Sequence, residues 1–104
     1  MRKIHHVGVI MHKPFKGEEH NTDLHLFCSN VENSKNRFEF LRFEENCPFP
    51  DLVKNNSHIA YQVDSMENEL KHAKLIYGPF TPVKGMDVAF IEEEGMPIEL
   101  DFFY

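Results

Sequence analysis

The sequence has no apolar run that approaches the roughly 18 residues of a membrane span, and its N-terminus lacks a signal-peptide profile. Basic residues are outnumbered, because 11 Lys and Arg stand against 17 Asp and Glu, which gives a formal net charge of −6. This charge disfavours a nucleic-acid surface or an anionic membrane surface, since either partner needs a basic patch. We therefore expect a soluble chain that binds neither nucleic acid nor membrane.

Cysteine is scarce and tryptophan is absent. The two cysteines, Cys28 and Cys47, lie in unlike contexts without C-x-x-C spacing, so we expect free thiols in a reducing cytoplasm and no disulfide. Ten phenylalanines favour a core built on aromatic and aliphatic strand residues. With 104 residues, of which 41% are hydrophobic and 27% are charged, the chain has the composition of one globular domain.

Alternating and β-branched segments predict strands along most of the chain. The first half has three, at residues 4–11, 24–29 and 37–44. The loop at 11–23 contains Pro14 and Gly17 and lacks helical periodicity, and the proline-containing segment 45–56 holds the link between the halves. The second half opens with a strand at 58–63 and a short helix that begins at the capping-box spacing of Asp64 and Glu67. Further strands follow at 77–83, 86–92 and 96–103.

The two halves repeat the same order of elements. The second half reads β-α-β-β-β, and the first reads β-loop-β-β, as if a loop had replaced its helix. Each half has a histidine in its early strand (His6 and His58) and a glutamate between apolar residues in its late strand (Glu39 and Glu99). We therefore predict an α+β fold in which two modules, at about 1–50 and 56–104, form one domain with a cupped, barrel-like mixed sheet.

The repeated polar residues predict a metal site. Alternate residues of a strand share a face, so His6, Glu39, His58 and Glu99 would project from the polar faces into one concavity. Two buried carboxylates repel each other, and burying each carboxylate without a counter-charge costs on the order of several kcal/mol. A divalent cation held by two neutral imidazoles and two carboxylates resolves this repulsion. Zn, Fe, Ni, Co and Mn all suit these ligands, and open coordination positions would admit substrate oxygens.

Three segments, HHVGVI, SHIAYQVDSMENEL and VAFIEEEGMPIELDFF, resemble the vicinal oxygen chelate superfamily. That superfamily includes glyoxalase I, methylmalonyl-CoA epimerase, extradiol dioxygenases and bleomycin-resistance proteins. The resemblance implies two βαβββ modules that surround a metal. The implied ligands are His6, His58, Glu99 and, in the first module, Glu39 or, if the register slips, Glu44 or Glu45.

His5 precedes the first of these ligands and is expected on the opposite face of its strand. Asp101 shares a strand face with Glu99. It could contact the metal ligands there, but we favour a position that faces the solvent.

The resemblance also implies a function and an assembly. A metal-dependent lyase or isomerase of glyoxalase or epimerase type would move a proton on a small oxygenated metabolite, with Glu39 or Glu99 as the general base. The family commonly forms dimers, so we expect a homodimer. The alternative is a non-catalytic small-molecule binding protein of bleomycin-resistance type, and a dioxygenase is a third option. The substrate is not given by the sequence.

Overall fold

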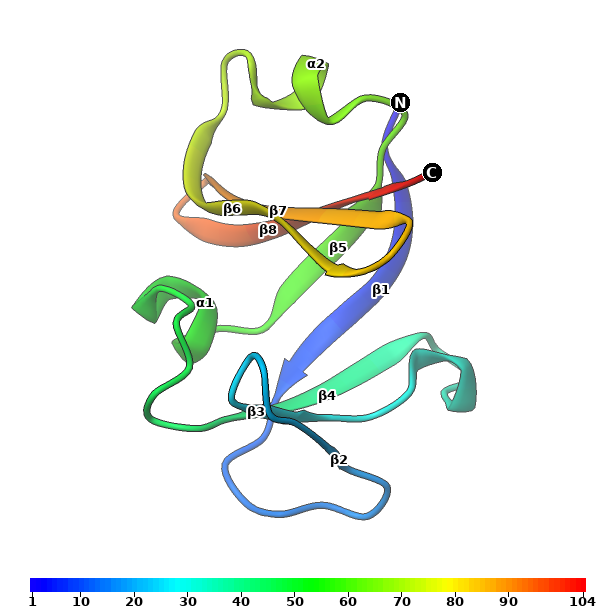
Figure 1. The fold of residues 1–104 in the computed structure, drawn as a ribbon, viewed down its shortest axis with the longest axis vertical. Coiled ribbons are helices and arrows are strands. Elements are labelled where there is room, and N and C mark those ends of the chain that lie inside the picture. Colours follow the sequence, from blue (N-terminus) through cyan, green and yellow to red (C-terminus); the bar gives the residue numbers. More distant parts are fainter.

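Eight strands form one continuous mixed sheet in the computed structural model, which describes residues 1–104 (Figure 1). The strands are β1 (Lys3–Ile10), β2 (Glu19–Asn21), β3 (Leu26–Cys28), β4 (Phe38–Phe43), β5 (His58–Gln62), β6 (Lys74–Val83), β7 (Met86–Glu93) and β8 (Met96–Phe103). The helical segments are the 3-10 helix η1 (Val31–Asn33) and the helices α1 (Asp51–Asn55) and α2 (Met66–Leu70). None of these helices has the length and apolar character that a membrane crossing requires.

The order of the strands shows the two modules side by side. It runs β2-β3-β4-β1-β5-β8-β7-β6, so the first strand of each module lies at the centre of the sheet. β1 pairs with β4 in parallel, β5 pairs with β8 in parallel, and β1 and β5 pair with each other in antiparallel orientation. The predicted α+β class with a cupped mixed sheet is confirmed.

Most predicted strands are present, and the first module has no α-helix between β1 and β4, as expected. Two segments predicted as irregular do contain regular structure. β2 lies within the predicted loop 11–23, where it pairs with β3. α1 lies within 45–56, and it begins after Pro50, which occupies the N-cap position. A proline is tolerated there because the helix does not use the backbone N–H that proline lacks.

The helix of the second module is shorter than predicted and has a different cap. α2 ends at Leu70, and Lys74 already belongs to β6. The side chain of Ser65, not of Asp64, accepts a hydrogen bond from the Asn68 backbone N–H at 3.1 Å. A serine one position later serves equally well as an N-cap, because it also offers a side-chain oxygen to a free N–H of the first turn.

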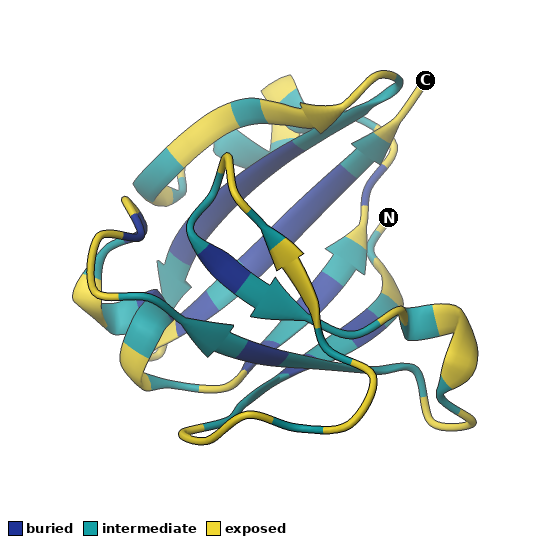
Figure 2. Ribbon diagram, turned by 60° about the horizontal axis from the view of Figure 1, so that its bottom comes forward, coloured by how far each residue is buried: buried dark blue, intermediate teal, exposed yellow.

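Two hydrophobic clusters lie on opposite faces of the sheet. The larger one contains buried residues from both modules: Leu26, Leu41, Cys47, Phe49, Val53, Val88 and Phe90. The smaller one consists of Val63, Ile91 and Leu100, and the apolar side of α2 covers it. Buried residues follow the central strands, whereas β6 and the loops are mostly exposed (Figure 2).

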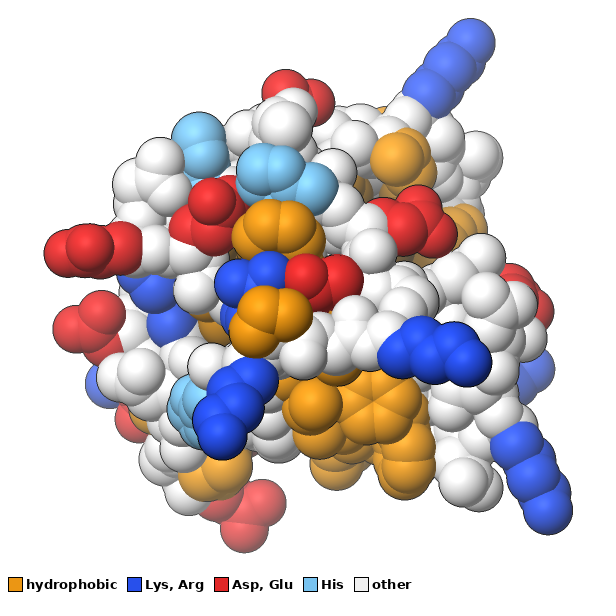
Figure 3. Space-filling model, turned by 90° about the horizontal axis from the view of Figure 1, so that it is seen from below, with side chains coloured by type: hydrophobic (Ala, Val, Ile, Leu, Met, Phe, Trp, Pro, Cys, Tyr) orange, Lys and Arg blue, Asp and Glu red, His pale blue; other side chains and the backbone are white.

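The end of the molecule that carries β2 and the loop after β1 has a mixed surface. Acidic and basic side chains both lie on it, around a group of exposed hydrophobic side chains, and neither sign forms a continuous field (Figure 3).

Candidate metal centre

The central strand pair places the two strand histidines diagonally across from each other. His6 on β1 lies opposite Ala60 on β5, and Gly8 on β1 lies opposite His58 on β5. The small residue in each pair leaves room for the imidazole of the other. A Cβ at position 8 would lie 2.6 Å from His58 Nε2, so the ring fills the space above the glycine.

The parallel neighbours bring the two glutamates to the same rows. Glu39 on β4 is the register partner of Gly8, and Glu99 on β8 is the register partner of Ala60. Each small residue therefore has a histidine on one side and a glutamate on the other. The repeat seen in the sequence becomes an approximately two-fold arrangement about the β1–β5 pair.

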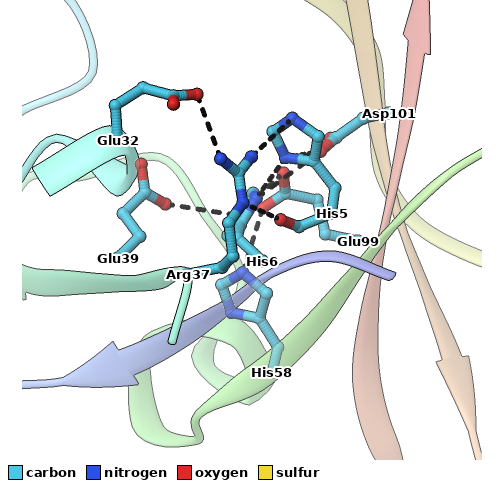
Figure 4. A network of polar contacts seen from close by, with 8 residues as sticks. All are labelled: His5, His6, Glu32, Arg37, Glu39, His58, Glu99 and Asp101. Atoms are coloured by element: carbon cyan, nitrogen blue, oxygen red, sulfur yellow. Dashed lines mark hydrogen bonds and ion pairs between the residues drawn. The ribbon is translucent and has the colours of Figure 1, made fainter. Parts of the chain in front are cut away.

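Three of the four predicted ligands converge closely. The potential ligand atoms of His6, His58 and Glu99 all lie within 4.8 Å of one another. His58 Nε2 lies 3.0 Å from Glu99 Oε1, and His6 Nε2 lies 3.6 Å from Glu99 Oε2. Glu39 joins through His6 alone, because its Oε1 lies 3.4 Å from His6 Nε2 (Figure 4).

The two alternatives to Glu39 lie elsewhere. Glu44 contacts His20 Nε2 at 2.6 Å near the surface, and Glu45 is exposed. Neither lines the cavity that contains His6. The register therefore brings Glu39 to the site.

Burial and charge act on the two histidines with opposite results. Burial opposes a charge on His6, but the carboxylates of Glu39 and Glu99 outweigh it and raise the pKa of His6 to about 9. Burial, assisted by the neighbouring His6, lowers the pKa of His58 to about 4. Burial also raises the pKa of Glu99 above its usual range. The cluster of His6, His58, Glu39 and Glu99 thus carries negative charge that its buried surroundings do not stabilise. A bound cation would stabilise that charge.

The residues present fit a divalent cation. His6 Nε2 is buried and makes no hydrogen bond, although two carboxylates lie within 3.6 Å of it. Buried polar atoms in proteins almost always have a partner, and a cation between this nitrogen and the two carboxylates would supply one. Two imidazoles with carboxylate oxygens form a donor set that first-row transition metals prefer.

Two further residues lie against the site, contrary to the expectations for them. Asp101 is completely buried instead of solvent-facing, with its Oδ2 3.9 Å from His6 Nδ1 and 3.8 Å from His5 Nδ1. Burial and the adjacent Glu99 raise the pKa of Asp101 to about 10. His5 does not point to the opposite face, because the pairing register shifts between Ile4 and His6 and brings the two Nδ1 atoms to 2.8 Å.

Only one of these two residues had a signal in the sequence. Asp101 lies two positions after Glu99, so strict alternation places it on the same face, and the buried neighbours of β8 account for its burial. The irregularity that turns His5 inward has no counterpart in the residue pattern. Arg37 reinforces it by donating to the His5 carbonyl oxygen at 2.9 Å (Figure 4).

The four predicted ligands open onto a cavity of about 190 Å³ on the concave side of the sheet. Seventeen residues line it, of which 11 are hydrophobic. The site is therefore a polar floor beneath mostly apolar walls, as expected for a pocket that takes a small molecule.

Comparisons with known proteins find this fold in two solved structures. The hypothetical protein BH1468 from Bacillus halodurans C-125 matches with a TM-score of 0.67 and 18% identity, over 99% of this chain and 95% of that one. Methylmalonyl-CoA epimerase from Mycobacterium tuberculosis matches with a TM-score of 0.62 and 17% identity, over 97% of this chain and 87% of that one. No family model matches the chain, and neither does any curated protein.

The match to the epimerase agrees with the resemblance drawn from the sequence segments. The chain shares with both solved structures a fold in which paired modules form one curled sheet.

Proposed function

We propose that the chain is a metal-dependent lyase or isomerase of glyoxalase or epimerase type, which moves a proton on a small oxygenated metabolite. One observation supports this most strongly: the ligand atoms of His6, His58 and Glu99 meet at the floor of a mostly apolar cavity, where His6 Nε2 makes no hydrogen bond. The epimerase among the structural neighbours supports the same reaction class.

In this proposal His6, His58 and Glu99 hold the cation, and their imidazole and carboxylate donors suit Zn, Ni, Co, Fe or Mn. When bound, a divalent cation stabilises negative charge that develops on a substrate oxygen, so an adjacent C–H becomes more acidic. The residues of the chain supply the rest: a base to take the proton and walls that exclude water.

Glu39 is better placed than Glu99 to be the general base. Glu39 is only half-buried, lines the cavity and contacts the histidines through His6 alone. Glu99 is buried and lies between both imidazoles, so its carboxylate has less freedom to turn. A base must come within hydrogen-bond reach of the proton that it removes, which favours the more mobile carboxylate.

A non-catalytic binding protein is the second candidate, and the apolar character of the cavity favours it. Such a protein needs the hydrophobic walls but not the paired histidines and glutamates. For either function we expect a homodimer in the cytoplasm. Sedimentation analysis would test the dimer.

Metal analysis of protein purified without an affinity tag tests the proposal. We expect about one equivalent of a transition metal, as for a single site. The metal should be lost in His6→Ala and His58→Ala but kept in His72→Ala, which changes an exposed histidine outside the cavity.

Proton transfer is tested by the exchange of the α-hydrogens of 2-hydroxyacetophenone in deuterated water, followed by NMR. Exchange that depends on the metal supports the enzyme. Folded wild-type protein that neither retains nor takes up metal leaves the binding protein as the better description.

A further inference from the structure

The cavity above the candidate metal centre contains no lysine or arginine side chain. Its acidic lining residues are Glu39 and Glu99, and the remaining polar ones are the two candidate ligands His6 and His58 and the amide of Asn21. Two carboxylates and a divalent cation cancel each other, so the loaded site would be neutral. A substrate carboxylate or phosphate would bring an additional negative charge that no side chain of the cavity balances.

Two arginines, Arg37 just before β4 and Arg42 within it, are engaged outside the cavity. Arg37 donates to the His5 carbonyl oxygen at 2.9 Å and to Glu32 at 3.0 Å. Arg42 donates twice to Glu18, at 3.1 and 2.6 Å, and lies over the ring of Phe27. Neither arginine lines the cavity, so neither offers a charge to a bound anion.

Aromatic side chains form a continuous wall of the cavity. The ring of Phe49 packs against those of Phe43, Phe80 and Phe90, with centroid separations of 5.9, 5.8 and 5.1 Å. All four rings line the cavity. Phe90 also meets the His58 ring edge-on at 5.5 Å, so the aromatic wall reaches the candidate metal ligands directly.

Resting on the proposed function, we propose that the substrate is an uncharged molecule with a ring-sized apolar body, which presents its oxygen atoms to the metal ligands. Aromatic walls favour an apolar or planar body through burial and ring contacts. An anion placed in a water-poor cavity without a counter-charge is strongly disfavoured. The cavity volume of about 190 Å³ is below the roughly 300 Å³ at which pockets for larger ligands begin.

Four probe compounds distinguish the effect of the ligand's charge on binding from the effect of its apolar ring. 2-Hydroxyacetophenone and mandelate share a phenyl ring and two neighbouring oxygen-bearing carbons, but only mandelate is an anion. Hydroxyacetone and lactate are the corresponding pair without the ring. Their dissociation constants would be measured by calorimetry at pH 7.5, with protein loaded with Zn²⁺ and with protein treated with EDTA.

We expect 2-hydroxyacetophenone to bind at least about tenfold more tightly than both mandelate and hydroxyacetone, a difference of about 1.4 kcal/mol. Equal or tighter binding of mandelate overturns the charge selection. Equal binding of hydroxyacetone, or no binding of either phenyl compound at millimolar concentration, overturns the apolar-body selection.

Two variants locate the selectivity in the cavity. Met86→Lys adds a cation to the lining, and it should shift the preference toward mandelate by at least about tenfold. Phe80→Ala removes part of the aromatic wall, so it should weaken the binding of 2-hydroxyacetophenone but not the binding of hydroxyacetone. Leu75→Ala changes an exposed side chain outside the lining and should leave all four constants unchanged. Circular dichroism verifies the fold, and preferences that stay at wild-type values in folded Met86→Lys and Phe80→Ala overturn the proposal.

This failure is distinct from a failure of the proposed function. Metal-loaded protein that exchanges α-hydrogens but prefers mandelate contradicts the substrate class alone. Protein that binds no metal yet prefers 2-hydroxyacetophenone contradicts the enzyme, while the selectivity of the cavity stands.

Discussion

Gly8 lies directly opposite His58 across the β1–β5 pair, and the His58 ring occupies the volume that a side chain at position 8 would need. A Cβ there would lie 2.6 Å from Nε2 and 2.8 Å from Nδ1 of the imidazole. The ring cannot retreat easily, because it is itself buried and Phe90, which is also buried, meets it edge-on at 5.5 Å. The absence of a side chain at residue 8 is thus a condition for the orientation of His58.

We expect Gly8→Ala to lower the affinity for a divalent metal by at least about tenfold, or 1.4 kcal/mol, because the methyl group displaces the His58 ring from the ligand group. The free energy of unfolding should fall by about 1–3 kcal/mol, as for other overpacked cores. A chromophoric chelator in competition would give the metal affinity, and urea denaturation would give the stability.

Gly95→Ala is the matched control for this variant. Gly95 has a φ of +79° in the β7–β8 turn, and nothing lies within 4 Å of where its Cβ would be. Alanine there should cost about 1–2 kcal/mol of stability through backbone strain alone. Its metal affinity should equal that of the wild type. If Gly8→Ala also binds metal like the wild type, the packing of His58 on Gly8 does not orient the ligand.

The strands and the pairing of the site residues could be predicted because both leave a regular mark on the sequence. β4 and β8 each place a glutamate between two apolar residues, and such alternation is typical of a strand. The repeat then relates Glu39 to Glu99 and His6 to His58. Since the two modules pair through their first strands, residues at equivalent positions meet at the middle of the sheet.

The features that could not be predicted leave no such mark. α1 has only five residues, which is too few for a helical period to become visible. The register shift before His6 turns His5 toward the site, and it depends on contacts between strands that are distant in sequence. Alternation with Glu99 predicts the face of Asp101 but not its complete burial, which results from the packing of whole strands, because a lone aspartate near a strand end is usually exposed.

The metal-free protein is expected to lose stability as the pH rises above neutrality. Folded His6 keeps its proton up to a pKa of about 9, whereas an unfolded histidine loses it near 6.5. The folded state therefore binds more protons in this window, and its extra stability, complete below pH 6.5, disappears as the pH approaches 9. The slope is about 1.4 kcal/mol per pH unit for each such proton. Urea denaturation in EDTA from pH 6 to 9 would measure it.

Bound metal should flatten this dependence, since a metal ligates the deprotonated imidazole. His58 does not contribute above pH 7, because its pKa of about 4 leaves it neutral in the folded state, as it is when unfolded. Stability of the metal-free protein that stays constant or rises between pH 7 and 9 would contradict the prediction.

Asp101→Asn should reduce the same slope without breaking the site. The folded carboxyl keeps its proton to a pKa of about 10, whereas an unfolded aspartate ionises near 3.8, so Asp101 adds a second proton to the folded state. The amide has the same shape and does not ionise. We expect the slope between pH 7 and 9 to become shallower, by up to about 1.4 kcal/mol per pH unit for the proton that is lost. An unchanged slope would mean that Asp101 is ionised in the folded protein.

Replacing each site glutamate by glutamine should have different effects on metal binding and on proton transfer. Glu99 lies 3.0 Å from His58 and 3.6 Å from His6, so Glu99→Gln should lower metal affinity at least about 100-fold, beyond the usual effect of a supporting residue. Glu39 contacts His6 alone. Glu39→Gln should keep metal affinity within about tenfold of the wild type but slow α-hydrogen exchange by about 10²–10⁴-fold, as for loss of a general base.

Glu44→Gln is the control for these two variants, because Glu44 contacts His20 away from the cavity. It should bind metal and exchange hydrogens like the wild type. Competition with a chelator and NMR of 2-hydroxyacetophenone in deuterated water give the two readouts independently. Equal loss of metal in Glu39→Gln and Glu99→Gln would make both carboxylates ligands. Exchange at the wild-type rate in Glu39→Gln would instead remove Glu39 as the base and leave Glu99 in that role, because Glu99 is the other carboxylate that lines the cavity.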